Sequence, residues 1–194
     1  MIKSIDFYFD FISPYSYLAH KKIIKLKQKN NINFNYKPIL LGGLHNLQGI
    51  TAPAFIKSKL KHMIGDCDLI AKKDKSNFIW NSKFPINSLN IMRGYLLINN
   101  ENKDLYLNII FDAYWKDNLD ISNEEILKSL LKKCKIDPDN FFKVIKDTKI
   151  KEELKIVTQE AHSKEVFGAP TFVVNNKIFW GQDRLDFALN EYNT

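Results

Sequence analysis

Cysteine is scarce in this chain of 194 residues, and its histidines follow no metal-site spacing. The two cysteines, Cys67 and Cys134, lie far apart and form no C-x-x-C pair. The four histidines form neither H-x-x-x-H nor H-E-x-x-H. We therefore expect free thiols, buried or partly exposed, in a reducing compartment, and no bound metal.

Arginine is also scarce, since Arg93 and Arg184 are two of 29 basic residues and the rest are lysines. Proteins that read nucleic acids favour arginine, whose fork makes bidentate contacts with bases and phosphates. The lysines are scattered among asparagine and isoleucine rather than clustered with aromatic residues. The formal charge of +7 therefore predicts a solvated surface, not a nucleic-acid partner, although it can steer anionic substrates toward the protein.

Long apolar runs are missing, and none approaches the roughly 20 residues that a membrane-spanning helix needs. Asp6 and Asp10 interrupt the segment that would have to be the apolar part of a secretory signal. The composition, 45% hydrophobic and 26% charged, is typical of a soluble globular protein. We expect a cytoplasmic protein that makes no membrane contact.

The most informative stretch is the junction at Ser13, where a strand-like segment over 5–12 meets Pro14. Proline fixes a φ that suits the first turn of a helix, so Ser13 is expected at the N-terminus of a helix. There the first N–H groups lack partners and the helix dipole is positive, which stabilises an anion such as a thiolate. The alternative is that Ser13 acts only as an N-cap, a common role of serine.

The pattern along the chain predicts an α/β protein with a helical insertion. Alternation and turn signals predict a β-α-β start, a long helical block and a β-β-α end. The elements expected in the two outer parts are strands over 5–12, 34–41, 171–174 and 177–180, with helices over 15–28 and 183–192; Gly42-Gly43 should end the second strand. This order suits a four-stranded mixed sheet formed by residues 1–43 and 161–194.

Residues 44–160 carry a helical pattern throughout and are expected to form the all-helical insertion. The expected helices cover 53–63, 88–99, 103–116, 124–134, 140–147 and 150–165. Ser122 and Glu125 have the spacing of a capping box. The aromatic residues of this block are better explained as its core than as a cofactor site; they are Phe111, Tyr114, Trp115, Phe141 and Phe142.

The element order, the helix N-terminus after the first strand and the proline before the third strand resemble the thioredoxin fold. The motifs resemble one branch of it, which includes the kappa-class glutathione transferases and, more closely, the 2-hydroxychromene-2-carboxylate isomerases. These motifs are residues 10–19, 38–43, 84–89, 113–115, 166–172 and 179–185. Redox thioredoxins carry C-x-x-C at the helix N-terminus, whereas this chain has Ser13-Pro14-Tyr15-Ser16, which excludes a dithiol oxidoreductase.

The resemblance implies a glutathione-dependent enzyme, usually a homodimer, that interconverts 2-hydroxychromene-2-carboxylate and trans-o-hydroxybenzylidenepyruvate in aromatic compound catabolism. Ser13 matches the catalytic serine of the family, whose hydroxyl would donate a hydrogen bond to the glutathione thiolate. The thiolate would add reversibly to the conjugated double bond of the substrate, which allows rotation before elimination.

The same resemblance implies further site residues. The implied glutathione contacts are Ser13, Lys59, Asp66, Ala169, Pro170, Gln182 and Asp183, with Pro170 in the cis form. Lys59 would bind the glycyl carboxylate, although Lys57, Lys59 and Lys61 also fit an ordinary solvated helix face. Asp66 would contribute to this site or to that of a neighbouring subunit, and Gln182 and Asp183 would bind the γ-glutamyl end. Candidate contacts of the aromatic substrate are Asn87, Arg93 and Trp180, for each of which a packing or surface role is open. Ile50 departs from relatives that often carry a glutathione-binding asparagine.

Two alternative functions stay open at this point. The same activated thiolate would serve a kappa-like glutathione transferase or peroxidase that acts on another electrophile. A non-catalytic glutathione-binding module would keep the fold and lack the chemistry.

Overall fold

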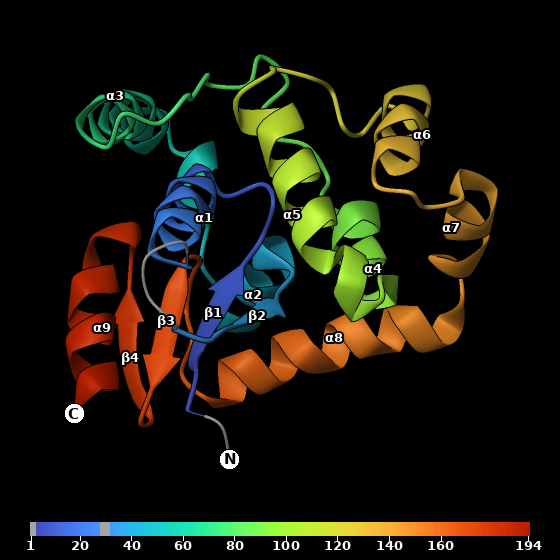
Figure 1. Ribbon diagram of the computed structural model, residues 1–194. Helices are drawn as coiled ribbons and strands as arrows, with labels where there is room; N and C mark the ends of the chain where they lie inside the picture. Colours follow the sequence, from blue (N-terminus) through green and yellow to red (C-terminus); the bar gives the residue numbers. More distant parts are fainter. Residues whose placement is uncertain (1–2, 28–31) are drawn as a thin grey trace.

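The computed structural model describes residues 3–27 and 32–194, with a four-stranded mixed sheet as its centre (Figure 1). The strands are β1 (Ile5–Phe9), β2 (Phe34–Pro38), β3 (Thr171–Val174) and β4 (Lys177–Trp180), in the order β2-β1-β3-β4. β1 is parallel to β2, and β3 is antiparallel to both β1 and β4. The β-α-β start and β-β-α end predicted from the sequence are confirmed.

Side chains from both faces of the sheet are buried, because helices cover each face. Phe7, Phe9 and Phe172 belong to the main core, together with residues of α1 (Pro14–Lys27) and α9 (Leu185–Asn193). Tyr8, on the opposite face of β1, packs in a smaller cluster with residues of α2 (Leu41–Gln48) and α8 (Thr148–Ser163). Figure 1 shows α8 extending from the sheet to the far side of the helical part.

The middle of the chain is helical, as the pattern predicts. Its elements after α2 are η1 (Pro53–Phe55), α3 (Lys57–Lys73), α4 (Leu89–Leu97), α5 (Asn100–Trp115), α6 (Glu124–Lys133) and α7 (Pro138–Val144). Phe111, Tyr114 and Trp115 are fully buried, which confirms their assignment to the core. Trp115 Nε1 donates a hydrogen bond to Phe11 O at 2.8 Å and so joins the helical block to the loop after β1.

The first strand ends at Phe9 rather than at residue 12, and three further local predictions between residues 38 and 125 are wrong. The second strand ends at Pro38, and Gly42-Gly43 lie inside α2, because buried Leu44 and the Leu41 N–H bond to Asp10 outweigh the poor helix propensity of glycine. The third helix begins at Lys57 and continues to Lys73, past the expected end at residue 63, because Cys67 and Ala71 extend its buried face.

The third error concerns the start of α6. Asn123, not Ser122, caps this helix, because Asn123 Oδ1 accepts hydrogen bonds from the N–H groups of Glu125 and Ile126. The Ser122 hydroxyl instead bonds to Asp120.

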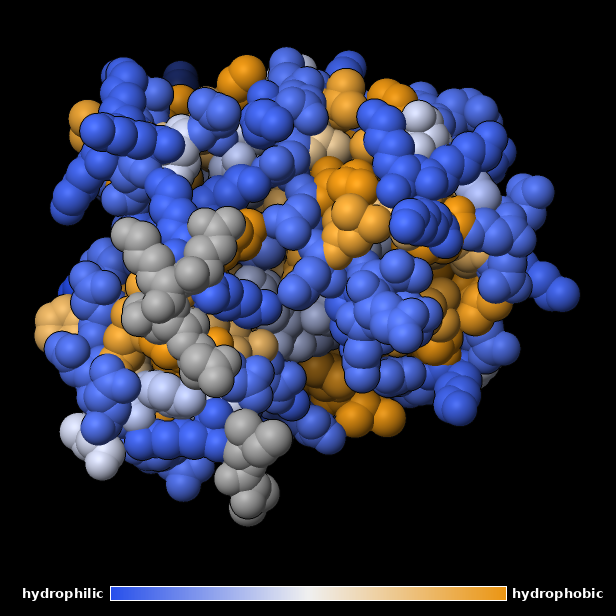
Figure 2. Space-filling model, viewed as in Figure 1, coloured by the Kyte–Doolittle hydropathy of each residue, from blue (hydrophilic) through white to orange (hydrophobic). Residues whose placement is uncertain are grey.

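The hydrophilic surface and the free cysteines are as the composition predicts. Figure 2 shows a largely hydrophilic face on which hydrophobic residues gather in separate small groups. Among the helices of the described residues, none has the length and apolar character that crossing a membrane requires. Cys67 and Cys134 are free and buried, and burial raises the pKa of each thiol to about 12, so both stay protonated.

Candidate active site at the N-terminus of helix α1

Four chain segments converge at one edge of the sheet. β1, β2 and β4 all end at this edge and β3 begins there, because β3 runs antiparallel to its two neighbours. This edge therefore brings together Ser13, the Ala169-Pro170 peptide and the turn at Gly181. More than 150 residues separate Ser13 from the other two segments along the chain.

Ser13 caps α1 and also contacts the loop before β3. Its Oγ accepts a hydrogen bond from the Ser16 N–H at 3.1 Å and donates one to Ala169 O at 3.0 Å. The residue is 3% exposed. Ser13 is therefore the N-cap of α1, and the same oxygen joins the helix N-terminus to the segment expected to bind a tripeptide.

Two segments near the end of the chain, Ala169-Pro170 and Gln182-Asp183, are predicted to bind glutathione, and they lie in contact with each other. The Ala169–Pro170 peptide bond is cis, as predicted, and the Gly181 N–H donates to Pro170 O at 2.9 Å. Gly181 has φ +107°, which glycine adopts readily and other residues rarely do. A Cβ at Gly168 would lie 2.7 Å from Trp180 Nε1, so a side chain there would displace the indole.

Gln182 and Asp183 follow in a 3-10 turn, η2 (Gln182–Arg184), so the last helix begins at Leu185 rather than at the predicted residue 183. Gln182 is buried, and its Oε1 accepts a hydrogen bond from Lys22 Nζ on α1. Asp183 is exposed and pairs with Arg184 at 2.7 Å. Gln182 is therefore bonded to α1 at Lys22, nine residues after Ser13.

Asp66 is held against the first turn of α1. The hydroxyl of Tyr15, two residues after Ser13, donates a hydrogen bond to Asp66 Oδ2 at 2.8 Å. Lys59 is exposed and lies seven residues before Asp66, so both occupy the same face of α3 about 10 Å apart.

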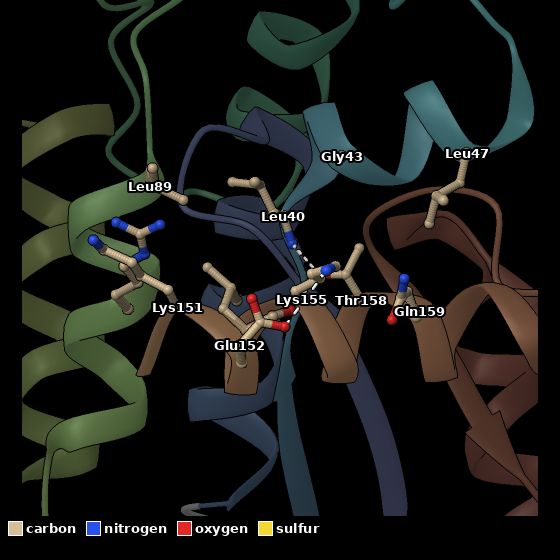
Figure 3. A pocket seen from close by; sticks show the side chains of 11 residues that line it. Leu40, Gly43, Leu47, Leu89, Lys151, Glu152, Lys155, Thr158 and Gln159 are labelled. Carbon is tan, nitrogen blue, oxygen red and sulfur yellow. Dashed lines mark hydrogen bonds and ion pairs between the residues drawn. The ribbon is translucent and has the colours of Figure 1, made fainter. Parts of the chain in front are cut away.

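The three predicted substrate contacts lie in different places. Trp180 is 55% exposed, ends β4 opposite Thr171 and packs against Phe167, whose ring centroid is 5.1 Å away. Asn87 is exposed, and its Oδ1 accepts the Leu89 N–H at the start of α4. Arg93 lines a cavity of about 360 Å³ between α2, α4 and α8, and Ser13 does not border that cavity (Figure 3).

The sequence analysis missed Asp10 as a site residue. Its carboxylate is 1% exposed and accepts three hydrogen bonds, from the Ile12 N–H (3.1 Å), the Leu41 N–H (2.9 Å) and the Ser88 hydroxyl (3.1 Å). Burial raises the pKa of Asp10 to about 6, and the three hydrogen bonds oppose that rise.

Asp10 is also bound to the serine, since its carbonyl oxygen accepts the Ser13 N–H at 3.0 Å. An acid at the end of an apolar strand, three residues before the capping serine, was the signal in the sequence that could have identified it.

Comparison with known proteins agrees with this fold. The family model described as "DSBA-like thioredoxin domain" matches residues 4–193. The 2-hydroxychromene-2-carboxylate isomerase of Sphingobium xenophagum is 29% identical and is aligned over 96% of each chain. Glutathione S-transferase kappa 1 of Caenorhabditis elegans is 27% identical over 93% of this chain and 86% of its own. A solved structure of 2-hydroxychromene-2-carboxylate isomerase superposes with a TM-score of 0.88 at 26% identity, over 96% of this chain and 92% of the other.

Proposed function

Because this chain belongs to the DSBA-like thioredoxin domain family, we propose that it is a glutathione-dependent isomerase. The proposed reaction interconverts 2-hydroxychromene-2-carboxylate and trans-o-hydroxybenzylidenepyruvate, a step in aromatic compound catabolism. Similarity to the Sphingobium xenophagum isomerase over nearly the whole chain supports this reaction class. The hydrogen bond from Ser13 Oγ to Ala169 O carries the proposal, because it joins the helix N-terminus to the segment that would bind glutathione.

The sulfur for this chemistry has to come from a ligand. Ser13 and Ser16 occupy the two positions that hold cysteines in redox thioredoxins, and Cys67 is a buried thiol whose raised pKa keeps it protonated. Bound glutathione would supply a thiolate that adds reversibly to the conjugated double bond of the substrate.

Ser13 would act as the activator of that thiol rather than as a nucleophile. Its oxygen is held by the Ser16 N–H, so it keeps its position when the hydroxyl proton turns from Ala169 O to a sulfur anion. This hydrogen bond and the positive end of α1 both favour the charged form of a thiol whose ordinary pKa is about 8.5.

The surroundings of Ser13 fit a tripeptide that carries two carboxylates and one ammonium group. In the proposal, Lys59 binds the glycyl carboxylate, the backbone at Ala169 and Pro170 pairs with the cysteinyl unit, and the polar groups at Gln182 and Asp183 bind the γ-glutamyl end. Asp66 would contact the tripeptide in this subunit or across a homodimer in the cytoplasm. Ile50 is 48% exposed and offers no amide, so we expect one hydrogen bond fewer than in relatives with asparagine there.

The exposed pair of Trp180 and Phe167 is the best place for an aromatic ring near the serine. Trp180 lies directly across from Thr171, next to Pro170, and its indole has room for stacking because more than half of the residue is exposed. Asn87 would bind a polar group of the same substrate, whereas Arg93 lines a cavity that Ser13 does not border.

The second candidate function is a kappa-like glutathione transferase or peroxidase, which the similarity to Glutathione S-transferase kappa 1 favours. The same Ser13 geometry would serve both enzymes. Parallel assays of chromene isomerisation and of conjugation to a chloronitroarene decide between them.

The decisive variant is Ser13→Ala. We expect the absorbance of a bound thiolate at neutral pH to disappear and turnover to fall by about 10², the effect of one lost hydrogen-bond donor at a developing anion. Loss of the N-cap should lower the free energy of unfolding by about 1 kcal/mol. Ultraviolet titration of glutathione against both proteins measures the first effect.

Ser16→Ala is the matched control, because the Ser16 hydroxyl is buried without a hydrogen-bond partner in the described residues. Its thiolate signal should equal that of the wild type. Equal signals in Ser13→Ala would remove Ser13 from the mechanism, and the absence of any thiolate in the wild type would indicate a non-catalytic binding module.

A further inference from the structure

The cavity between α2, α4 and α8 is large enough for a small ligand. Its volume of about 360 Å³ falls within the range of small-molecule sites, roughly 300–1,000 Å³. Figure 3 shows Leu40, Leu89 and Leu47 on one side, opposite the charged side chains of α8. The cavity is lined by residues of α2, α4 and α8 and by Leu40, which precedes α2.

The charges around this cavity do not balance. Lys151, Lys155 and Arg93 are cationic, whereas Glu152 is the single acid among the lining residues. Glu152 pairs with Lys155 at 3.4 Å. Within residues 3–27 and 32–194, neither Lys151 nor Arg93 forms an ion pair, and the buried Nε of Arg93 has no hydrogen-bond partner.

An unpartnered polar atom in a buried position is costly, and the guanidinium fork of arginine matches a carboxylate. The leucine side chains that line the same cavity favour an apolar body on the bound molecule. We propose that this cavity binds an apolar monocarboxylate, such as an aryl or medium-chain acid, with its carboxylate against Arg93 and Lys151 and its apolar part against Leu40 and Leu89.

The cavity touches the hydrogen-bond network of Asp10 but not Ser13. Leu40 precedes the Leu41 N–H that binds the Asp10 carboxylate, and Leu89 follows Ser88, which binds the same oxygen. The proposal concerns binding alone, so it does not depend on the proposed isomerase activity. Ligand binding should persist in Ser13→Ala, which separates a failure of one proposal from a failure of the other.

The test uses 1-naphthoate, titrated by calorimetry against the full-length protein. Arg93→Gln and Lys151→Gln should each raise its Kd about tenfold, the effect of one lost charge-assisted hydrogen bond. Lys149→Gln is the control, because Lys149 lies two residues away on α8 and does not line the cavity. The neutral analogue 1-naphthalenemethanol should bind more weakly than 1-naphthoate to the wild type.

A pair of neighbouring glycines gives a second test that leaves the charges in place. Gly43 lines the cavity, and a Cβ there meets the Leu40 side chain at an ordinary 3.5 Å, so Gly43→Leu should fill the cavity and abolish binding. Gly42 has open space around it and does not line the cavity, so Gly42→Leu should bind 1-naphthoate like the wild type.

Competition with the substrate identifies the source of the natural ligand. Competitive inhibition of turnover by 1-naphthoate would show that the cavity binds the second substrate of the enzyme. Non-competitive inhibition would show that it binds a different carboxylic acid. Both outcomes support the proposed binding site. The proposal is overturned if 1-naphthoate fails to bind, or if Arg93→Gln and Gly43→Leu both bind it with wild-type affinity.

Discussion

At the scale of single residues, Asp10 determines how the segments around Ser13 meet. One carboxylate accepts hydrogen bonds from the loop after β1, the start of α2 and the segment before α4. Burial of an ionised carboxylate is unfavourable, and three donors offset part of that cost. Asp10 is therefore both a structural connection and a titrating group next to the site.

Asp10 predicts a specific pH dependence of stability. Its pKa is raised to about 6 in the folded protein, whereas an unfolded aspartate titrates near about 4, so the folded state holds the proton more tightly. The stabilisation is fully present below about pH 4 and is lost as the pH rises through about 6, a change of about 3 kcal/mol. Urea unfolding between pH 4 and pH 7 measures it.

Asp10→Asn should remove this contribution, so the difference in unfolding free energy between wild type and variant should change with pH over that interval. Asp6→Asn is the control, because Asp6 lies on β1, the strand that precedes Asp10, and bonds to the exposed Asn35 side chain. A constant difference between wild type and Asp10→Asn from pH 4 to pH 7 would contradict the assignment.

At the scale of elements, the turn from β4 into η2 depends on one glycine. Gly181→Ala would place a Cβ 2.5 Å from Asp183 Oδ1 and force an L-residue into φ +107°. We expect a loss of about 1–3 kcal/mol in unfolding free energy. The affinity for glutathione should fall as well, because Gly181 positions Pro170 and Gln182.

Thermal unfolding and a glutathione titration measure the two effects. Gly65→Ala is a suitable control, since Gly65 lies in α3 with open space around it, and this change should stabilise the protein by up to about 1 kcal/mol. A Gly181→Ala protein as stable as the wild type would show that the turn tolerates a side chain.

Several elements could be predicted because their signals are local. Pro14 after Ser13 marks the start of α1, and Asn175-Asn176, both at positive φ, form the hairpin between β3 and β4. α2 could not be predicted, because its two glycines argue against a helix and its support comes from distant groups. The Asp10 network and the Arg93 cavity were missed for the same reason, since both depend on contacts between segments that are remote in sequence.

At the scale of the whole molecule, the main core is continuous between the sheet and the helical block. Phe9 and Phe11 pack against Phe111 of α5, with centroid distances of 5.9 and 4.6 Å. We therefore expect a single cooperative unfolding transition, even though residues 44–160 were predicted to form a separate insertion domain.

Circular dichroism and tryptophan fluorescence test this expectation, since Trp80 and Trp115 lie in the helical block and Trp180 lies on β4 of the sheet. Both signals should show one coincident transition in urea. A fluorescence transition in two separate steps would show that the helical block unfolds on its own.

The burial of Cys67 and Cys134 has a consequence for how such a protein would be controlled. Because both thiols are buried and protonated, mild oxidants and alkylating reagents do not react readily with them in the folded chain. Under the proposed function, turnover would then follow the supply of reduced glutathione, so the surrounding thiol pool, and not the polypeptide, would sense oxidative stress.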